Sequence, residues 1–405
     1  MAACVGIIAE YNPFHNGHLH QLARAKELSD CAHAIVAMSG SFTQRGEPAC
    51  ADKFTRARWA LENGADLVVE LPTLFSMAGA ERFARGGVAL LGASGIAEAL
   101  SFGAEDADIG TLRALASLTA LEGGALKQRL AAHLAAGKSF PAARAAALAD
   151  AHGGEEIRSA LLSPNNILAF EYIKAIDMLY PGMRPVPVRR QGAAHDADAP
   201  AGGFASASSL RAALGRSDAE FLGAFAPKNV SEDCARLLAS GDMPCTADAL
   251  SDAFLYALRR LPSRELAKLP DVAEGLENAI YREARARTRY EGVLAAIKSK
   301  RYTLARLRRI LSCALLEITK EKLRANPAPR YIRVLGARKD SLGLLSRLAG
   351  SASLPIVTCK ADYDRLGDEA RAMLDLDLFA AEVLAMAAPK PRAAEYEFAR
   401  PLTIV

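Results

Sequence analysis

The sequence predicts an α/β protein, with a parallel, doubly wound sheet in its first part and a mainly α-helical second part. Short apolar runs, helical patterns between them and a long helical remainder support this class. The apolar runs cover residues 4–9, 33–38, 66–71, 98–102 and 184–189. They are continuous rather than alternating, which is typical of strands buried on both faces, and their alternation with helices indicates a parallel sheet.

The helices of the first part follow from their patterns and end signals. Helices are expected within 19–28 and 52–64, and the second ends at Gly64, a common helix terminator. An Ala-rich region from about 111 to 180 predicts a helical insertion between the fourth and fifth strands. Ligands of such a sheet bind beyond the carboxyl ends of its strands.

The rest of the chain stays helical in pattern. Apolar residues recur at helical spacing between Leu250 and Leu261, and the stretches 330–348 and 354–360 add short strand-like pieces. We therefore expect two domains, an α/β domain at 1–215 that carries the insertion and a mainly helical domain at 216–405.

Composition indicates an ordinary globular chain. It has 405 residues, of which 51% are hydrophobic and 24% charged, so it can bury a sizeable core. Glu10 and Asn12 interrupt the first apolar run and no basic region precedes it, so neither a signal peptide nor a membrane span is expected, and the cytoplasm is the expected location. Seven cysteines without a CxxC pair speak against a disulfide framework and a zinc site, and no metal site is expected.

Two histidines, His15 and His18, lie between the first strand and the first helix, with Asn16 and Gly17 between them. At a strand–loop–helix turn, glycine lets the backbone approach a ligand, and the helix start offers free amide groups to phosphate. Two imidazoles there can stabilise charge that develops in phosphoryl or nucleotidyl transfer. The alternative is a capping loop with satisfied surface histidines.

Two further stretches support the phosphate interpretation. The sequence SASSLR at 206–211 places Ser208, Ser209 and Arg211 at the start of a predicted helix. A polar loop after the second strand carries groups that suit a phosphate or carboxylate partner, and the alternative is a solvated loop before an amphipathic helix. The substrate-loop candidates are Ser39, Gln44, Arg45 and Lys53.

A dense basic segment runs from Tyr281 to Arg309. It holds ten basic residues against two glutamates, a net charge of +8, whereas the whole chain carries only +4. This asymmetry indicates a surface that docks a polyanion, and the interleaved tyrosines suit base stacking. The alternative is the solvated face of a long helix. The RNA-binding candidates are Lys298, Lys300, Arg301, Tyr302, Arg306, Arg308 and Arg309.

Several blocks together resemble a known family. The HNGH stretch after the first strand and SASSLR late in the domain resemble the two signatures of the nucleotidyltransferase superfamily, whose fold is Rossmann-like. The blocks YNPFHNGHLHQL, MSGSFTQRGEPA, GADLVVELP, LSFGAE, SPNNILAFEYIKA and KRYTLARLRRIL resemble the tRNA(Met) cytidine acetate ligases. The resemblance implies an enzyme that activates acetate with ATP, giving acetyl-adenylate and pyrophosphate, and then transfers the acetyl group to N4 of the wobble cytidine of elongator tRNA(Met).

The resemblance also implies functional positions. It assigns His15, His18 and Arg211 to catalysis, with Mg²⁺ accompanying ATP. The implied ATP-binding residues are Ile7, Ile8, Ala9, Glu10, Tyr11, Asn12, Pro13, Phe14, His15, Asn16, Gly17, His18, Leu19, His20, Gly103, Asn165, Arg189 or Arg190, Ser208 and Ser209.

This chain departs from the family pattern after the fifth strand. It reads RQGAAHDAD where the family usually reads close to R-x-G-A-G-Y-H-D, one residue longer. The departure leaves open which arginine contacts ATP and what His195 and Asp196 do. Phe54 stands where the family often has tryptophan.

Two other functions fit parts of the sequence. An adenylyltransferase that makes a dinucleotide cofactor would use the same signatures, but would not need the basic segment. A non-catalytic RNA-binding protein on a degenerate scaffold would use the basic segment, but would not need intact His15, His18 and Arg211. The sequence does not indicate an oligomeric state.

Overall fold

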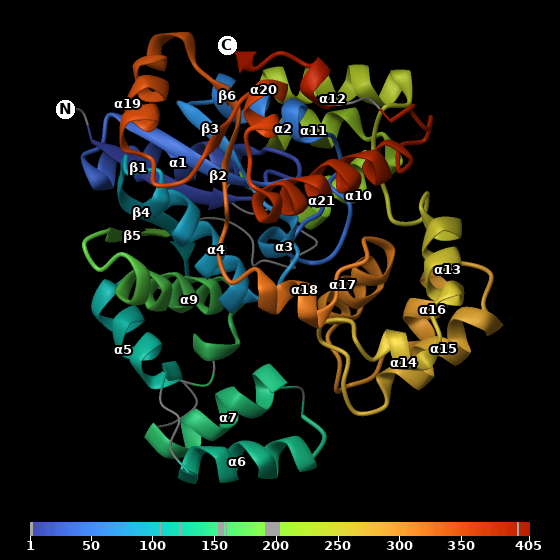
Figure 1. Ribbon diagram of the computed structural model, residues 1–405. Helices are drawn as coiled ribbons and strands as arrows, with labels where there is room; N and C mark the ends of the chain where they lie inside the picture. Colours follow the sequence, from blue (N-terminus) through green and yellow to red (C-terminus); the bar gives the residue numbers. More distant parts are fainter. Residues whose placement is uncertain are drawn as a thin grey trace.

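The fold is built on one mostly parallel sheet of eight strands (Figure 1). The computed structural model describes residues 3–105, 107–120, 124–138, 140–152, 158, 160–190, 203–394 and 397–405. The strands are β1 (Cys4–Ala9), β2 (His33–Ser39), β3 (Leu67–Leu71), β4 (Ala97–Ala104), β5 (Arg184–Arg189), β6 (Ile332–Ala337), β7 (Ile356–Val357) and β8 (Thr403–Ile404). The first five lie where the apolar runs predict them, so the predicted fold class is confirmed.

The strand order is β5-β4-β1-β2-β3-β6-β7, with β8 beside β6. Strands β1 to β5 pair in parallel, and among the strands that the structure describes β3 and β6 form the antiparallel pair. From β1 the chain adds β2 and β3 on one side and β4 and β5 on the other. The order therefore reverses at β1, and the crevice at the carboxyl ends of β1 and β4 is the expected ligand position.

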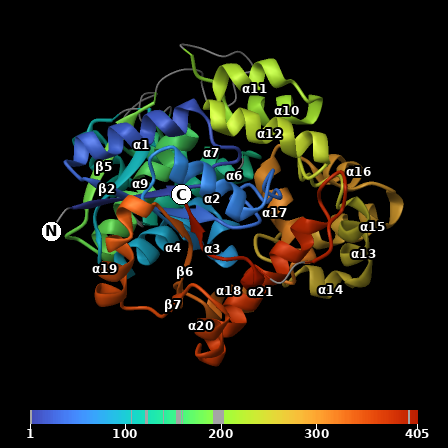
Figure 2. The ribbon, with the colours of Figure 1, turned by 90° about the horizontal axis from the view of Figure 1, so that it is seen from above.

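Both faces of the sheet are covered by helices. In β2, Ile35 and Ala37 join one apolar core, whereas Ala34, Val36 and Met38 join the other, which explains the continuous apolar run. Helices α1 (Asn16–Ser29) and α2 (Lys53–Glu62) pack on one face and share its core with α10 (Ala207–Arg216) and α12 (Lys228–Ser240). Helices α4 (Ala80–Ala93) and α9 (Pro164–Leu179) lie on the opposite face (Figures 1 and 2).

The helices that accompany strands β1 to β5 are α1 (Asn16–Ser29), α2 (Lys53–Glu62), α3 (Thr73–Ser76), α4 (Ala80–Ala93), α9 (Pro164–Leu179), α10 (Ala207–Arg216), α11 (Ala219–Phe225) and α12 (Lys228–Ser240). The insertion comprises α5 (Ile109–Ala120), α6 (Gly124–Ala135), α7 (Phe140–His152) and α9, in agreement with the predicted helical region.

The second part of the chain is largely helical but returns to the sheet. Its helices are α13 (Ser251–Arg260), α14 (Ser263–Leu266), α15 (Leu276–Ala286), α16 (Tyr290–Ile297), α17 (Leu304–Leu315), α18 (Lys320–Ala325), α19 (Gly343–Ser351), α20 (Lys360–Asp364) and α21 (Asp368–Ala385), with short 3-10 turns at Lys339–Ser341 and Glu397–Ala399. The strand-like pieces predicted after residue 330 form β6 and β7, which extend the sheet beyond β3. The division at residue 215 stays a prediction, although strands from both sides of it share one sheet.

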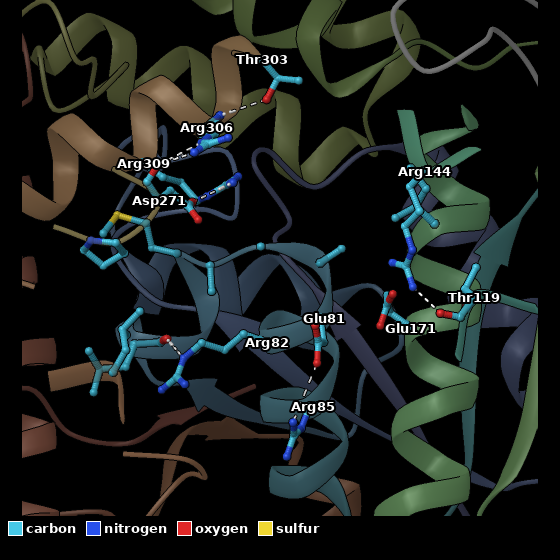
Figure 3. Close-up of a pocket in the computed structure, with 18 of the residues that line it drawn as sticks. Glu81, Arg82, Arg85, Thr119, Arg144, Glu171, Asp271, Thr303, Arg306 and Arg309 are labelled. Atoms are coloured by element: carbon cyan, nitrogen blue, oxygen red, sulfur yellow. Dashed lines mark hydrogen bonds and ion pairs between the residues drawn. The ribbon is translucent and has the colours of Figure 1, made fainter. Parts of the chain in front are cut away.

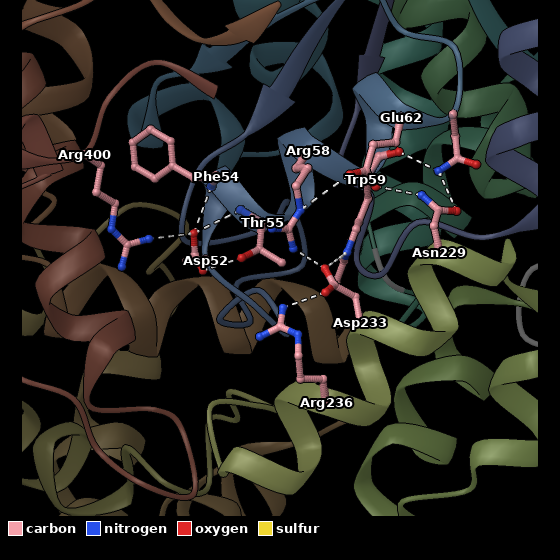
Figure 4. A network of polar contacts seen from close by, with 11 residues as sticks. Asp52, Phe54, Thr55, Arg58, Trp59, Glu62, Asn229, Asp233, Arg236 and Arg400 are labelled. Carbon is pink, nitrogen blue, oxygen red and sulfur yellow. Dashed lines mark hydrogen bonds and ion pairs between the residues drawn. The ribbon is translucent and has the colours of Figure 1, made fainter. Parts of the chain in front are cut away.

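A polar network joins α2 to α12 (Figure 4). The carboxylate of Asp233 on α12 accepts hydrogen bonds from Trp59 Nε1 at 2.8 Å, from Arg236 at 2.6 Å and from Arg58. Glu62 accepts a further bond from Asn229 at 2.8 Å. Arg58 and Glu62 are therefore structural, and the network fixes the helix that follows the predicted substrate loop.

Within the residues that the structure describes, no helix combines the length and apolar character needed to cross a membrane.

Candidate nucleotide site

The two histidines of the HNGH stretch cap the first helix. His15 is the N-cap residue of α1, and its Nδ1 accepts the backbone N–H of Gly17 at 3.0 Å. His18 Nδ1 in turn accepts the backbone N–H of His15 at 3.3 Å, which completes a reciprocal capping box. The two rings stack with centroids 3.7 Å apart. The capping interpretation is thus correct for Nδ1, and it fixes where Nε2 points.

Both imidazoles are neutral and carry their proton on Nε2. A neutral imidazole has one donor and one acceptor nitrogen, and each Nδ1 here accepts a backbone N–H, so we assign the proton to Nε2. Burial, and then the charges of Arg190 and Arg211, lowers the pKa of His15 to about 3. Burial, His15 and Arg190 hold the pKa of His18 well below 6.5. Two N–H donors therefore stand beside a helix N-terminus, an arrangement that suits phosphate oxygens.

The loop before α1 is shaped closely around these rings. A Cβ on Gly17 would lie 2.8 Å from His15 Cε1, so the ring occupies the space that a side chain would need. Tyr11 has a φ of 46°, a region that side chains rarely adopt, and its buried ring packs edge-on against His18 at 4.8 Å. Strained positions of this kind cluster at functional sites.

The implied ATP-binding block spans three kinds of structure. Ile7, Ile8 and Ala9 end β1, residues 10–15 form the loop, and residues 16–20 form the first turns of α1. Leu19 is 39% exposed on the outside of the helix, and His20 packs against Phe204 instead of the histidine pair.

The second signature reaches the same loop from α10. Ser206 is the N-cap of α10, and its Oγ accepts the backbone N–H of Ser209 at 3.0 Å. One turn along, Arg211 donates to the Asn12 carbonyl at 3.1 Å and to Ser208 Oγ at 3.4 Å. The structure therefore joins Arg211 and Ser208 to the loop that leads into His15.

A third group comes from β4, α9 and the end of β5. Arg190 donates to Asn165 Oδ1 at 3.1 Å, and Asn165 donates to Glu105 at 3.2 Å. A Cβ on Gly103 would approach the Arg190 side chain at 3.5 Å. Gly103, Asn165 and Arg190 thus meet at the end of β4, and Arg190 rather than Arg189 is the arginine in this group. His195 and Asp196 lie outside the described residues.

The polar loop after β2 bonds to the loop after β1. Glu10 Oε1 accepts the backbone N–H of Gln44 at 2.8 Å, and Asn12 Oδ1 accepts that of Cys50 at 2.7 Å. Most of residues 40–52 are buried, so the alternative of a solvated loop is wrong. Gln44 and Arg45 are partly exposed, whereas Ser39 is buried at the end of β2 with an unpaired Oγ.

Arg56, outside the candidate residues, ties the two loops together. Its buried guanidinium donates to the carbonyls of Glu10 at 2.7 Å, Ser39 at 3.0 Å and Gly40. The carbonyls at the ends of β1 and β2 are thereby held by one cation. The sequence shows Arg56 among the polar groups after the second strand, but it does not indicate that Arg56 binds backbone carbonyls. Glu105 is the other residue that the sequence did not indicate.

The sequence of this chain is similar to those of known enzymes over nearly its whole length. Residues 1–398 match a family model described as HIGH Nucleotidyl Transferase. A tRNA(Met) cytidine acetate ligase of Caldanaerobacter subterraneus subsp. tengcongensis is 36% identical over 398 residues, 98% of each chain. That of Bacillus subtilis is 35% identical over 399 residues, 97% of this chain and 94% of the relative. The chain belongs to the tRNA(Met) cytidine acetate ligase family of HIGH nucleotidyl transferases.

Two solved structures superpose on nearly the whole of this chain. Thermotoga maritima TmcAL bound with alpha-thio ATP superposes with a TM-score of 0.91 at 32% identity and covers 99% of both chains. An apo form of the same protein gives a TM-score of 0.93 at 32% identity, with 100% of this chain and 99% of that chain covered.

One predicted substrate-loop residue of this family member has another role. Lys53 is 1% exposed, and its ammonium pairs with Glu70 at 2.7 Å and with Glu397 at 2.9 Å. Arg333 also pairs with Glu397, at 2.6 Å. The prediction that Lys53 serves the substrate loop is therefore corrected: its charge is neutralised inside the core, between β3 and the C-terminal part of the chain.

The basic segment lies beside the predicted substrate loop. Arg308 on α17 pairs with Glu47 at 2.8 Å, and Ser312 donates to the Gly46 carbonyl at 2.7 Å. A Cβ on Gly46, whose φ is +77°, would lie 2.4 Å from the backbone nitrogen of Arg309. Close backbone packing thus seats α17 on loop 40–52.

Much of the segment's charge is engaged within the chain. Arg301 pairs with Glu274 at 2.7 Å, and Tyr302 donates to the same carboxylate at 3.5 Å. Arg306 donates to the Asp271 carbonyl and stacks on Tyr302 at 4.9 Å, and Arg309 pairs with Asp271 at 3.2 Å. Lys298 and Lys300 are exposed.

Proposed function

We propose that this protein is an ATP-dependent acetate ligase that forms N4-acetylcytidine at the wobble position of elongator tRNA(Met). It would proceed through acetyl-adenylate and release AMP and pyrophosphate. Membership of the family supports the reaction, and the paired imidazoles support its first step. The observation that carries the proposal is the pair of Nε2–H donors at the start of α1, with Arg190 and Arg211 beside them.

The chemistry needs charge stabilisation more than it needs a nucleophile. Acetate is a poor electrophile until ATP converts one of its oxygens into a leaving group, with cleavage at the α-phosphate. We assign stabilisation of the α-phosphate and pyrophosphate to His15, His18 and Arg211. No thiol is required, and burial raises the pKa of the neighbouring Cys50 to about 11, so that it stays protonated and unreactive.

The other groups would hold ATP in place. Gly103, Asn165 and Arg190 lie at the end of β4, and the charge of Arg190 acts on both histidines, so a nucleotide would span the crevice of the sheet between them. Gln44 and Arg45 would face acetate or the acceptor from loop 40–52. This assignment leaves Arg189 and Lys53 outside the site.

Magnesium would enter with ATP rather than reside in the protein. Among the described residues, no group of three His, Cys, Asp or Glu side chains could hold a metal ion. Mg²⁺ in ATP-using sites is usually bound by phosphate oxygens, water and one or two carboxylates, so it does not need such a group. The ion would supply Lewis-acid neutralisation of the phosphates, and the chain's own donors would orient them.

The acceptor would dock on the basic segment. Lys298 and Lys300 are exposed, and Arg308 and Arg309 of α17 contact loop 40–52. A cation-rich surface beside the ATP site suits an RNA backbone. A tRNA substrate also implies that the protein works in the cytoplasm.

The test is incubation of the purified protein with radiolabelled acetate, ATP and Mg²⁺, with and without total tRNA, followed by nucleoside analysis of the RNA. We expect label in N4-acetylcytidine only when ATP is present. AMP-containing products with other acceptors and no label in RNA would favour a cofactor adenylyltransferase. Binding of tRNA without any ATP turnover would favour a non-catalytic RNA-binding protein.

A further inference from the structure

A cavity of about 780 Å³ lies between the helical insertion and the helices of the second part (Figure 3). One wall comes from the start of α4, from α7 and from α9. The other comes from α17, α18 and the segment around Asp271. None of the histidine-loop residues lines this cavity, so among the described residues it is separate from the proposed nucleotide site.

The cavity nevertheless adjoins that site on two sides. Arg309 lines the cavity and donates to the Gln44 carbonyl at 3.4 Å, while the Gln44 N–H bonds to Glu10. On the other side, Phe170 and Glu171 line the cavity from α9, the helix whose first turn carries Asn165. A molecule in the cavity would therefore lie against the two elements that border the nucleotide site.

The lining is strongly cationic. Seven arginines line the cavity against three acidic residues, and guanidinium groups occur on both walls. The arginines are Arg82, Arg85, Arg144, Arg301, Arg306, Arg309 and Arg324, and the acids are Glu81, Glu171 and Asp271.

Several of these cations keep their charge. Arg144 donates to the Thr119 carbonyl, and Arg306 to the Asp271 carbonyl at 2.6 Å. Arg82 likewise donates to the Leu74 carbonyl at 2.9 Å. Bonds to neutral carbonyls orient a guanidinium without cancelling its charge. Glu171 is itself neutralised by Lys174 at 2.9 Å. Arg85 lies 3.9 Å from Glu81 and Arg309 lies 3.2 Å from Asp271, and the remaining lining arginines leave the cavity with a surplus of positive charge.

Part of the lining is apolar. It includes the buried side chains of Leu74, Met77, Leu148, Leu161 and Phe170. A lining that combines arginines with buried apolar side chains matches a ligand that has phosphates along one edge and flat bases along the other. The volume is in the range of small-ligand sites, which admits extruded nucleotides but not a duplex.

We propose that this cavity binds single-stranded nucleotides of the tRNA next to the target cytidine, with phosphates on the arginines of both walls and a base on the apolar part of the lining. The proposal rests on the proposed function and extends it. It assigns α4 and α7 of the N-terminal part, which the basic segment alone does not include, to RNA recognition. Loop nucleotides can be splayed out and stacked in this way, whereas paired ones cannot.

Arg85 and Arg144 test the proposal because both lie on the wall opposite the basic segment. The variants Arg85→Ala, Arg85→Glu and Arg144→Gln would be compared for tRNA binding in a filter assay and for KM and kcat in tRNA acetylation. We expect Kd and KM for tRNA to rise about tenfold for each neutral variant, and more for Arg85→Glu. The salt dependence of log Kd should fall by about 0.7 per lost phosphate contact. The KM for ATP and kcat at saturating tRNA should stay unchanged.

Arg113→Ala provides the matched control. Arg113 is 51% exposed on α5 of the same insertion and does not line the cavity, so its loss should leave tRNA binding unchanged. Thermal unfolding of each variant establishes that it is folded. If the wild-type protein acetylates tRNA and the Arg85 and Arg144 variants bind it as tightly as Arg113→Ala does, the cavity proposal is overturned while the proposed function stands. Failure of the wild-type protein to acetylate tRNA would instead overturn the function on which the cavity proposal rests.

Discussion

The histidine loop and the basic segment use their polar groups in opposite ways. In the histidine loop, each imidazole bonds the backbone through Nδ1 and keeps Nε2–H for a ligand. In the basic segment, Arg301, Arg308 and Arg309 are paired with carboxylates of the same chain. One region fixes its donors and leaves them open, whereas the other uses much of its charge to hold α17 in place.

The difference teaches that a local motif and a charge run carry different information. A capping box is complete within four residues, so its geometry follows from the sequence. The net effect of a cation depends on what the fold brings opposite to it, and Glu47 and Glu274 lie far along the chain from their partners. The run of +8 therefore overstates the charge that is free to meet RNA.

The largest expected effect is on catalysis at the histidine loop. His18→Ala removes one Nε2–H donor, and we expect the initial rate of tRNA acetylation at saturating substrates to fall by about 10²–10³-fold. His133→Ala, on α6 of the insertion, is the control and should retain the wild-type rate. If a folded His18→Ala protein kept the wild-type rate, His18 would act only as a structural cap, and the histidine loop would not hold donors for a ligand.

The second effect concerns the pH dependence of stability. Burial and the charges of Arg190 and Arg211 lower the pKa of His15 to about 3, whereas an unfolded histidine titrates near 6.5. Between these pH values the unfolded chain binds more protons, so this contribution to stability is complete above about pH 6.5 and is lost as the pH falls. His15→Asn keeps a cap acceptor but cannot titrate. Below pH 6.5, the unfolding free energy of this variant should depend less steeply on pH than that of the wild-type protein, by up to about 1.4 kcal/mol per pH unit. Urea unfolding at pH 7, 6, 5 and 4 measures this, and an unchanged slope would contradict a neutral His15.

The sequence predicted the centre of the fold better than its edge. Strands β1 to β4 are largely buried, which demands the nearly continuous apolar runs that are visible in the sequence, whereas the edge strand β5 alternates between buried and exposed residues. The pieces that form β6 and β7 were visible as well, but their pairing with β3 was not. That pairing depends on contacts between residues separated by more than two hundred positions, and nothing local encodes it.

The same limit divides the candidate site. His15 and His18 could be predicted because their partners are neighbours in sequence, and the ends of parallel strands explain why Gly103 and Arg190 meet. Lys53 was misassigned because its partners, Glu70 and Glu397, come from β3 and from near the C-terminus. Arg56 has a structural role for the same reason: it binds carbonyls, which leave no sequence signature.

A third prediction concerns the space around the His15 ring. Gly17→Ala places a Cβ 2.8 Å from His15 Cε1 and should displace the ring from the Gly17 N–H. We expect a roughly tenfold rise in KM for ATP and a loss of about 1 kcal/mol in unfolding free energy, the usual cost of a lost cap. Gly215→Ala on α10 meets no atom within 4 Å, so it should not lower stability. If the two variants behave alike, the histidine loop has space for a Cβ at position 17 and the His15 ring is not tightly confined.

The smallest expected effect tests whether the basic segment's charge is held back by the chain itself. Glu274→Gln removes the carboxylate that pairs with Arg301 at 2.7 Å, where the two side chains are 57% and 48% exposed. An exposed pair contributes at most about 1 kcal/mol, so stability should change little. The released cation should lower the KM for tRNA by about two- to threefold at low salt, and the gain should disappear at high salt because exposed charges are screened. Glu98→Gln at the start of β4 changes the net charge equally without touching the segment. If both variants shift KM alike, total charge attracts the RNA and Arg301 has no particular part in binding it.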